Sequence, residues 1–307
     1  MASIELFIIT LQLSYLVHFL NMKIYIFTIL LFFNVVMDVF AQDNLVANDT
    51  VSDADPYFIL MGEADDAIKE KNWPEAAARL SDALAVKPNH PSNTLLLYNL
   101  AKVYSCLGND SLAVVTYGRG LEIAPNMSVL YLGRGKTYLN MGDKRAAKAD
   151  FENVLDIDSL STEARYLHGM MSLYGGKIED AEADFKVLAS VAPKSFDTSM
   201  ALGTLYSLTG REKEAVPYLE KIIEYEPMPE IYASLAGCRL ALGELTEASE
   251  TIGEGLRLYP EDAELYYYRA WLNRDRFKND DAQADAQRAI DLGANPIKVK
   301  ELFLKKK

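Results

Sequence analysis

An internal repeat of about 34 residues constrains what this chain can fold into more than any other feature of its sequence. Alanine is followed by proline twelve residues later five times, first at Ala76 and Pro88 and last at Ala248 and Pro260. This spacing marks out seven units, and we number the residues within each unit as places. The units begin at Tyr57, Thr94, Ser128, Thr162, Phe196, Pro229 and Ala263. A period of this length fits two helices and their connections, so the sequence predicts a repeated helix pair.

Two places in the unit hold small residues in all seven copies. Place eight is alanine or glycine, at Ala64, Ala101, Gly135, Gly169, Gly203, Ala236 and Ala270. Place twenty is always alanine, at Ala76, Ala113, Ala147, Ala181, Ala215, Ala248 and Ala282. Two antiparallel helices approach each other closely only where the residues at the crossing are small. We therefore expect the two helices of each unit to cross at these two places, which a helical bundle with chance alanines would not explain.

Other places mark where the helices end and what fills the space between them. Place fifteen is glycine in the five inner units, at Gly108, Gly142, Gly176, Gly210 and Gly243. Glycine ends a helix readily because it adopts a positive φ at little cost. Place twenty-four carries a larger side chain in six units, and the seven residues are Leu80, Tyr117, Phe151, Phe185, Leu219, Ile252 and Ala286. We expect this side chain to fill the gap between the helices, and the proline near the unit's end to stop the second helix.

These residues together resemble the tetratricopeptide repeat over residues 57–294. The resemblance implies an all-α fold, a right-handed α-solenoid of about seven helix-turn-helix units. Residues 295–307 are expected to form a capping helix with a basic tail. In that helix Ile297, Val299, Leu302 and Phe303 would cover the last exposed apolar face.

The sequence departs from the family's pattern mostly in the outer units. Lys71 and Phe277 stand where the inner units have the turn glycine. Place eleven, where the family usually has an aromatic residue, is held by other residues at Ala67, Ser172, Arg239 and Asn273. End units of a solenoid are expected to be atypical. Ser172 and Arg239 lie in inner units, so we expect units four and six to pack less tightly than the others.

Residues 1–41 have a different composition from the repeats. They contain one lysine, one glutamate and one aspartate. Lys23, the mostly apolar residues 24–37 and the small residue Ala41 match the order of a secretory signal, in which a basic start precedes an apolar run and a cleavage site. We therefore expect cleavage after Ala41 and export to the periplasm or cell envelope.

Residues 1–21 do not fit that signal, because they carry no lysine or arginine. We expect translation to begin at Met22. The alternative is that the apolar segments stay as a membrane anchor. The acidic residues 42–56 are expected to form a disordered tether. Within them Asp49-Thr50-Val51 resembles the short acceptor used for O-glycosylation in Bacteroidetes, which suggests an exported bacterial protein of that kind.

Composition excludes several classes of function. Lysine and arginine number 31 against 44 aspartates and glutamates, and the net charge of −13 would repel a nucleic acid backbone. Two cysteines and three histidines are too few for a disulfide framework or a multi-histidine metal site. No Ser-His-Asp or Cys-His set emerges. We therefore expect no catalytic residues, no metal and no cofactor.

One short motif imitates a nucleotide-binding loop. Gly135-Lys136-Thr137 has the ending of such a loop, but Leu130 stands where the loop would need its first glycine. The motif also falls inside an expected helix and does not follow a strand. We therefore expect no nucleotide to bind there.

The family resemblance implies that the first helices line a concave surface that binds proteins or peptides. Places five and nine of the first helix share one face with places two and twelve and avoid the crossing. We predict eight partner-binding residues among them: Tyr98, Lys102, Leu132, Tyr166, Met170, Met200, Tyr267 and Trp271. The alternative for each is burial against a neighbouring helix, and the sequence does not decide between the two.

The sequence as a whole favours a non-enzymatic scaffold or adaptor that binds a protein or peptide in the periplasm or cell envelope. One alternative is a membrane-tethered structural subunit of an envelope complex, in which case the N-terminal segment would contact the membrane. A second alternative is an enzyme with its site on the solenoid.

Overall fold

The structure is a computed structural model, and it describes residues 55–304. The expected signal segment, almost all of the tether and the last three residues of the basic tail lie outside the described residues. The described part of the chain folds into fifteen α-helices, and no strand is found between residues 55 and 304. None of these helices is both long and apolar enough to cross a lipid bilayer.

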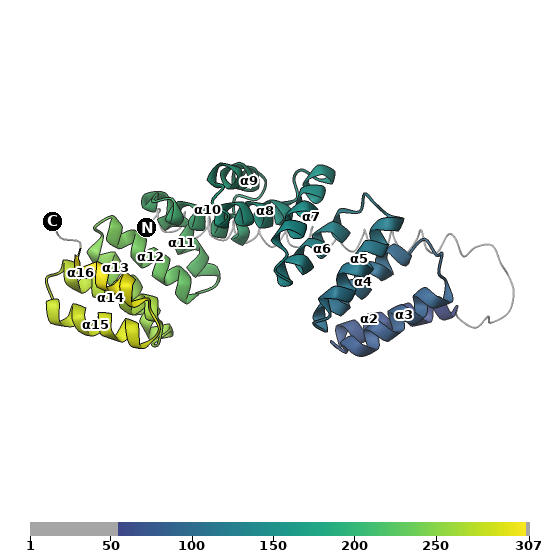
Figure 1. Cartoon of the computed structure of the whole chain (residues 1–307), viewed down its shortest axis with the longest axis horizontal. Helices are drawn as coiled ribbons and strands as arrows, with labels where there is room; N and C mark the ends of the chain where they lie inside the picture. The colour runs from purple at the N-terminus through teal and green to yellow at the C-terminus, as the bar shows by residue number, and fades with distance from the viewer. Residues whose placement is uncertain (1–54, 305–307) are drawn as a thin grey trace, which may run out of the picture. The chain divides into compact units, whose positions relative to one another are not determined.

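Seven helix pairs follow one another in chain order and a single helix closes the series (Figure 1). The first helices of the pairs are α2 (Pro56–Lys69), α4 (Asn93–Cys106), α6 (Ser128–Asn140), α8 (Thr162–Tyr174), α10 (Phe196–Leu208), α12 (Pro229–Ala241) and α14 (Ala263–Asp275). The second helices are α3 (Trp73–Val86), α5 (Asp110–Ile123), α7 (Lys144–Ile157), α9 (Ile178–Val191), α11 (Glu212–Tyr225), α13 (Leu245–Leu258) and α15 (Asn279–Asp291). The closing helix is α16 (Pro296–Leu304).

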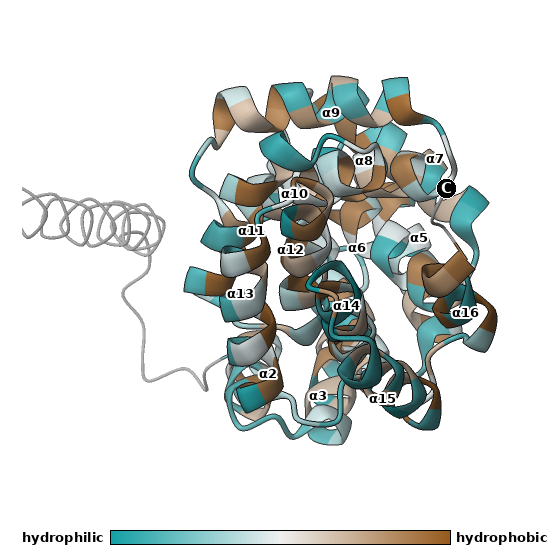
Figure 2. Ribbon diagram, turned by 90° about the vertical axis from the view of Figure 1, so that its left-hand side faces the viewer, coloured by the Kyte–Doolittle hydropathy of each residue, from teal (hydrophilic) through white to brown (hydrophobic). Residues whose placement is uncertain are grey.

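The helices pack mainly on their neighbours in the chain. Each first helix from α4 onward contacts the second helix of its own unit and the second helix of the unit before it. Brown and teal residues alternate along helices such as α9 and α13 (Figure 2), because each helix buries one face and exposes the other. The all-α fold that the sequence predicts is therefore confirmed.

The small residues at places eight and twenty lie at the crossing inside each unit. The alanine of place twenty is fully buried in all seven units. In units three and four the glycine of place eight faces the phenylalanine of place twenty-four. A β-carbon on Gly135 would lie 2.7 Å from a ring carbon of Phe151, and one on Gly169 would lie 2.4 Å from a ring carbon of Phe185. No carbon atom fits at such distances, so the large ring requires glycine opposite it.

Unit two has alanine at place eight although Tyr117, at place twenty-four, carries a large ring. Here the ring avoids the close contact by pointing in another direction. The ring of Tyr117 extends toward the first helix of the next unit. A β-carbon on Gly133 would lie 2.6 Å from the ring of Tyr117. Glycine at place six of unit three therefore makes room for a side chain of unit two.

Glycine also allows close packing between units. Gly120 of α5 faces Leu130 of α6, and a β-carbon on Gly120 would lie 3.0 Å from that leucine. In the same way, a β-carbon on Gly255 of α13 would lie 2.9 Å from the side chain of Leu265 of α14. Both glycines hold place twenty-seven, so a small residue there receives a leucine from the next unit.

The turn between the two helices needs a positive φ in every unit that has the glycine. The five glycines of place fifteen have φ between 71° and 79°. Lys71 and Phe277 adopt φ of 58° and 60° at the same place in the outer units. A side chain at such φ costs about 1–2 kcal/mol relative to the right-handed region. The turn geometry is therefore kept even where the glycine is absent.

The closing helix α16 covers the last pair. Val299 and Leu302 are buried against α14 and α15, whereas Ile297 and Phe303 are exposed. Polar contacts hold the helix in place as well. Lys298 Nζ lies 2.7 Å from Glu264, and Arg274 donates a hydrogen bond of 2.6 Å to the carbonyl oxygen of Leu302. Two of the four apolar residues expected to cover the end of the solenoid do so.

Replacement of two helical glycines by alanine should change stability in opposite directions. Gly169→Ala should lower the free energy of unfolding by about 1–3 kcal/mol, because Phe185 must move. A β-carbon on Gly253 of α13 would meet no neighbouring atom within 4 Å, and Gly253→Ala should raise stability by about 0.5–1 kcal/mol through helix propensity. Chemical denaturation measures both. Equal stabilities of the two variants would contradict the close crossing.

Candidate functional site

The eight predicted partner-binding residues lie on five first helices. We call them the first-helix stripe. Tyr98 and Lys102 belong to α4, Leu132 to α6, Tyr166 and Met170 to α8, Met200 to α10, and Tyr267 and Trp271 to α14. The structure brings some of them into one pocket and packs others against neighbouring helices.

Three residues of the stripe share a pocket of about 390 Å³ between α4 and α6. We call it the α4–α6 pocket. Tyr98, Lys102 and Leu132 line it together with the ring of Tyr117. The rings of Tyr98 and Tyr117 are 6.2 Å apart between centroids, and Lys102 Nζ lies 5.4 Å from the centroid of the Tyr98 ring. The pocket thus combines an apolar wall with an ammonium group.

Three charged residues line the α4–α6 pocket, namely Lys102, Lys136 and Glu163. Lys136 Nζ donates a hydrogen bond of 2.8 Å to Glu163, which lies in the first turn of α8. Lys102 is exposed and makes no ion pair with a carboxylate within the described part of the chain. Burial raises the pKa of Tyr117, so its phenol stays neutral. Lys102 is therefore the cation that remains to meet a negative group on a ligand.

The stripe residues of α8 and α10 pack against the cores between neighbouring helices. Tyr166 and Met170 are half-buried against the core formed by α8, α9 and α10. Burial raises the pKa of Tyr166. Met200 packs against the core between α11 and α12. These three side chains are half-buried, as Tyr98 and Leu132 are, and Met170 also lines a pocket between α7 and α8.

The stripe residues of α14 are largely covered. Tyr267 is 9% exposed, and Lys298 Nζ of the closing helix lies 4.5 Å from the centroid of its ring. Trp271 stacks on Tyr268 with 6.2 Å between centroids, and its indole donates a hydrogen bond of 2.8 Å to Asp275. Burial therefore describes Tyr267 better than exposure to a partner.

The family comparison agrees with the spacing of the units. A sequence model described as tetratricopeptide repeat matches residues 129–159 and 197–227. Both matches begin at place two of a unit, in units three and five. Units three and five are therefore similar in sequence to the tetratricopeptide repeat.

Other proteins with these repeats resemble the chain. The tetratricopeptide repeat and J domain-containing co-chaperone DNJ1 of Cryptococcus neoformans is 29% identical over 143 residues, which are 46% of this chain and 27% of the co-chaperone. This chain thus spans about a quarter of the length of that relative.

Solved structures show the same fold. A tetratricopeptide repeat protein from Parabacteroides merdae superposes with a TM-score of 0.58 at 23% identity, over 80% of this chain and 97% of that chain. YrrB, described as a tetratricopeptide repeat protein with an unusual peptide-binding site, superposes with a TM-score of 0.53 at 19% identity, over 60% and 96%. The solenoid of tetratricopeptide repeats that the sequence predicts is therefore confirmed.

The structure also contains buried carboxylates that the sequence analysis missed. Place twenty-three is a buried aspartate in units three, four and seven, at Asp150, Asp184 and Asp285. Each is paired with a basic residue at place seven of its own repeat. Arg134 donates hydrogen bonds of 2.8 and 2.7 Å to Asp150, and Arg269 donates bonds of 2.9 and 2.5 Å to Asp285.

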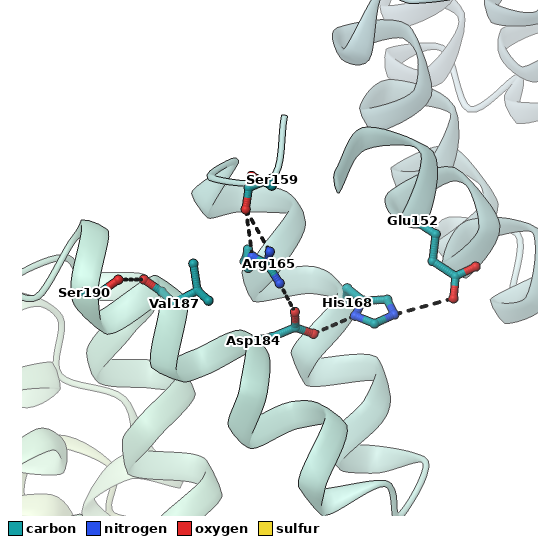
Figure 3. A network of polar contacts seen from close by, with 7 residues as sticks. All are labelled: Glu152, Ser159, Arg165, His168, Asp184, Val187 and Ser190. Carbon is teal, nitrogen blue, oxygen red and sulfur yellow. Dashed lines mark hydrogen bonds and ion pairs between the residues drawn. The ribbon is translucent and has the colours of Figure 1, made fainter. Parts of the chain in front are cut away.

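Unit four has the most elaborate of these networks (Figure 3). Asp184 accepts a hydrogen bond of 2.7 Å from Arg165 and lies 2.6 Å from His168 Nδ1. The other ring nitrogen of His168 lies 3.8 Å from Glu152. Arg165 also donates to the carbonyl oxygen of Ser159 at 2.8 and 3.0 Å. The histidine is thereby fixed between two repeats.

This network resembles part of a catalytic set but lacks a nucleophile on the histidine. The hydroxyl of Ser190 donates a hydrogen bond of 2.7 Å to the carbonyl oxygen of Val187 in its own helix. Because units three and seven carry the same carboxylate with arginine, the pairing is a packing feature of these repeats. Within residues 55–304 no cluster of three metal-binding side chains is found either.

Places seven and twenty-three vary together across the repeats. This joint variation is the sequence signal that could have revealed the pairs of charged residues. Units two, five and six have leucine at place seven and an uncharged residue at place twenty-three. Unit one reverses the charges, with Glu63 Oε2 3.2 Å from Arg79 Nε. Either both places are charged or neither is, because an unpaired charge would be costly to bury.

Proposed function

We propose that this chain is a non-enzymatic scaffold that binds protein or peptide partners through the first-helix stripe. The observation that carries the proposal is the α4–α6 pocket, in which Tyr98 and Leu132 offer an apolar wall beside the unpaired ammonium of Lys102. Aromatic and aliphatic anchors at the centre of an interface carry most of the binding energy. The pocket therefore suits an apolar side chain of a partner that also carries a negative group.

Two kinds of comparison support a binding role. The co-chaperone and YrrB are both described as tetratricopeptide repeat proteins, and YrrB is described as having an unusual peptide-binding site. Tetratricopeptide repeats are typically scaffolds, so we propose that this chain has no catalytic activity of its own. The proposal describes the partner only by the groups that the α4–α6 pocket would bind, an apolar side chain and a negative group.

We further propose that the protein acts after export, in the periplasm or cell envelope. This proposal rests on the sequence of residues 1–41 alone, in which Lys23, an apolar run and Ala41 have the order of a secretory signal. The alternative in which this segment is kept would make the protein a membrane-tethered subunit.

Removal of the apolar wall should abolish partner capture without unfolding the protein. We expect the double variant Tyr98→Ala and Leu132→Ala to capture at least tenfold less partner than the wild-type protein. Each truncated anchor should cost about 1–2 kcal/mol of binding free energy. The measurement is affinity capture from a native envelope extract with quantitative mass spectrometry. The control is Leu160→Ala with Leu208→Ala, which removes two exposed apolar side chains elsewhere. Undiminished capture by the first variant would refute the proposed surface.

Export has its own test. Sequencing of the N-terminus of the native protein should give Gln42 as the first residue, because a signal peptidase would cut after Ala41. A native protein that keeps Lys23 and sediments with membranes would favour the membrane-tethered alternative.

A further inference from the structure

The side chain at place eleven of each first helix differs between the units, and so does its packing against the second helices. Tyr104, Tyr138 and Tyr206 hold this place in units two, three and five. In unit five the ring of Tyr206 lies 5.9 Å from that of Tyr218, and the guanidinium of Arg211 lies 4.2 Å from the Tyr206 ring centroid. The tyrosine thus occupies the space between consecutive second helices.

Two units fill the same place with a polar side chain. Arg239 of unit six donates hydrogen bonds to Glu220 and to Thr251. Asn273 of unit seven donates a hydrogen bond of 2.9 Å to Asp285. The looser packing expected for unit six therefore does not follow from its missing aromatic residue, because the arginine is held on both sides.

Unit four is different, because serine leaves the place open. Ser172 is 4% exposed, and its hydroxyl has no hydrogen-bond partner within the described residues. The side chain lines a pocket of about 490 Å³ between α7 and α8, which we call the Ser172 pocket. Its apolar lining consists of Leu139, Leu167, Met170, Met171 and Tyr174. A pocket of this size lies in the range that takes a small ligand or a large side chain.

The rim of the Ser172 pocket is positively charged in a chain whose net charge is −13. Its four basic residues are Lys144, Arg145, Lys148 and Lys177. Lys148 pairs with Glu152 at 3.4 Å. The other three make no ion pair with a carboxylate between residues 55 and 304. Most of the positive charge at the rim is therefore free to meet an anionic ligand.

The junction of units four and five differs from that of units three and four, where the Ser172 pocket lies. Arg211 of unit five pairs with Glu182 of unit four at 2.8 Å, and the pocket that remains beside Tyr206 is smaller, at about 360 Å³. The equivalent places one unit earlier hold Lys177 and Lys148. Two lysines cannot form an ion pair, so no ion pair joins the two second helices at these places beside the Ser172 pocket. The missing ring and the missing carboxylate occur at the same junction.

We propose that the Ser172 pocket binds an aromatic side chain from an acidic segment of a partner protein. The ring would take the space that Tyr206 fills in the next unit. The buried hydroxyl of Ser172 would receive a hydrogen-bond partner, such as a tyrosine phenol, which removes the cost of leaving it unpaired. Carboxylates beside the aromatic residue would meet Lys144, Arg145 and Lys177 at the rim. This site is separate from the α4–α6 pocket and does not depend on it.

The test uses the full chain and a fluorescently labelled acidic heptapeptide with a central tyrosine. Fluorescence anisotropy should show saturable binding. The same peptide with a central alanine, or with lysines in place of the acidic residues, should bind at least tenfold more weakly. Both the anchor and its charge contribute in the proposal, so each change alone should reduce affinity.

Filling the pocket from within should block it. Ser172→Tyr introduces the residue that units two, three and five have at this place, and we expect at least a tenfold loss of peptide affinity with a melting temperature that is unchanged or higher. Ser172→Ala leaves the space open and should lose no more than about fivefold, the worth of one hydrogen bond. Equal affinity of the wild-type protein and Ser172→Tyr would overturn the proposal.

A charge reversal at the rim gives a second test if Ser172→Tyr disturbs the fold. Lys177→Glu should weaken binding several-fold, and it lies at the start of α9, where a negative charge favours the helix. Lys213→Glu makes the same change of charge at an exposed position on α11 and should leave affinity unchanged. Equal effects of the two variants would overturn the proposal.

One further variant separates this site from the proposed function. Tyr98→Ala with Leu132→Ala removes the wall of the α4–α6 pocket, and we expect it to bind the heptapeptide as the wild-type protein does. Loss of heptapeptide binding in this variant, with binding kept by Ser172→Tyr, would place the peptide in the α4–α6 pocket and overturn the assignment to Ser172.

Discussion

The close crossing of two helices at a buried alanine is the contact on which the rest of this structure depends. Place twenty is alanine in all seven units and is fully buried in each. The residue opposite, at place eight, is alanine or glycine, and it is glycine in the two units that carry phenylalanine at place twenty-four. Gly169 faces the ring of Phe185, whereas Ala64 packs with the smaller Leu80. Once the two axes are close, the remaining side chains of the unit have fixed positions.

The fold could be predicted from the sequence because the crossing residues and the turn glycines recur in every copy or nearly so. A single repeat would not have been enough, but seven copies in step leave few alternatives. The buried pairs at places seven and twenty-three were missed because neither place is constant. Arg134 with Asp150, and Leu235 with Thr251, look unrelated until the two places are compared unit by unit.

The candidate site was predicted less well, and the reason is what covers each residue. Tyr98 and Tyr267 hold the same place in their units, yet Tyr98 lines a pocket and Tyr267 is covered by Lys298. The sequence of one helix does not reveal which neighbour lies over it. The Ser172 pocket depends on two units of sequence at once, because the missing ring lies on α8 and the basic residues of the rim lie on α7 and at the start of α9. Both pockets lie where a unit departs from the pattern that packs the others.

The most direct test of this account compares two alanines on α9 that differ only in whether they lie at the crossing. Ala181 is fully buried at place twenty, and Ala183 is exposed two residues later. We predict that Ala181→Leu lowers the free energy of unfolding by about 1–3 kcal/mol through overpacking, whereas Ala183→Leu changes it by less than about 0.5 kcal/mol. Chemical denaturation of the two variants gives the answer. Equal stabilities would show that the helices do not cross at place twenty, which would contradict the account at its foundation.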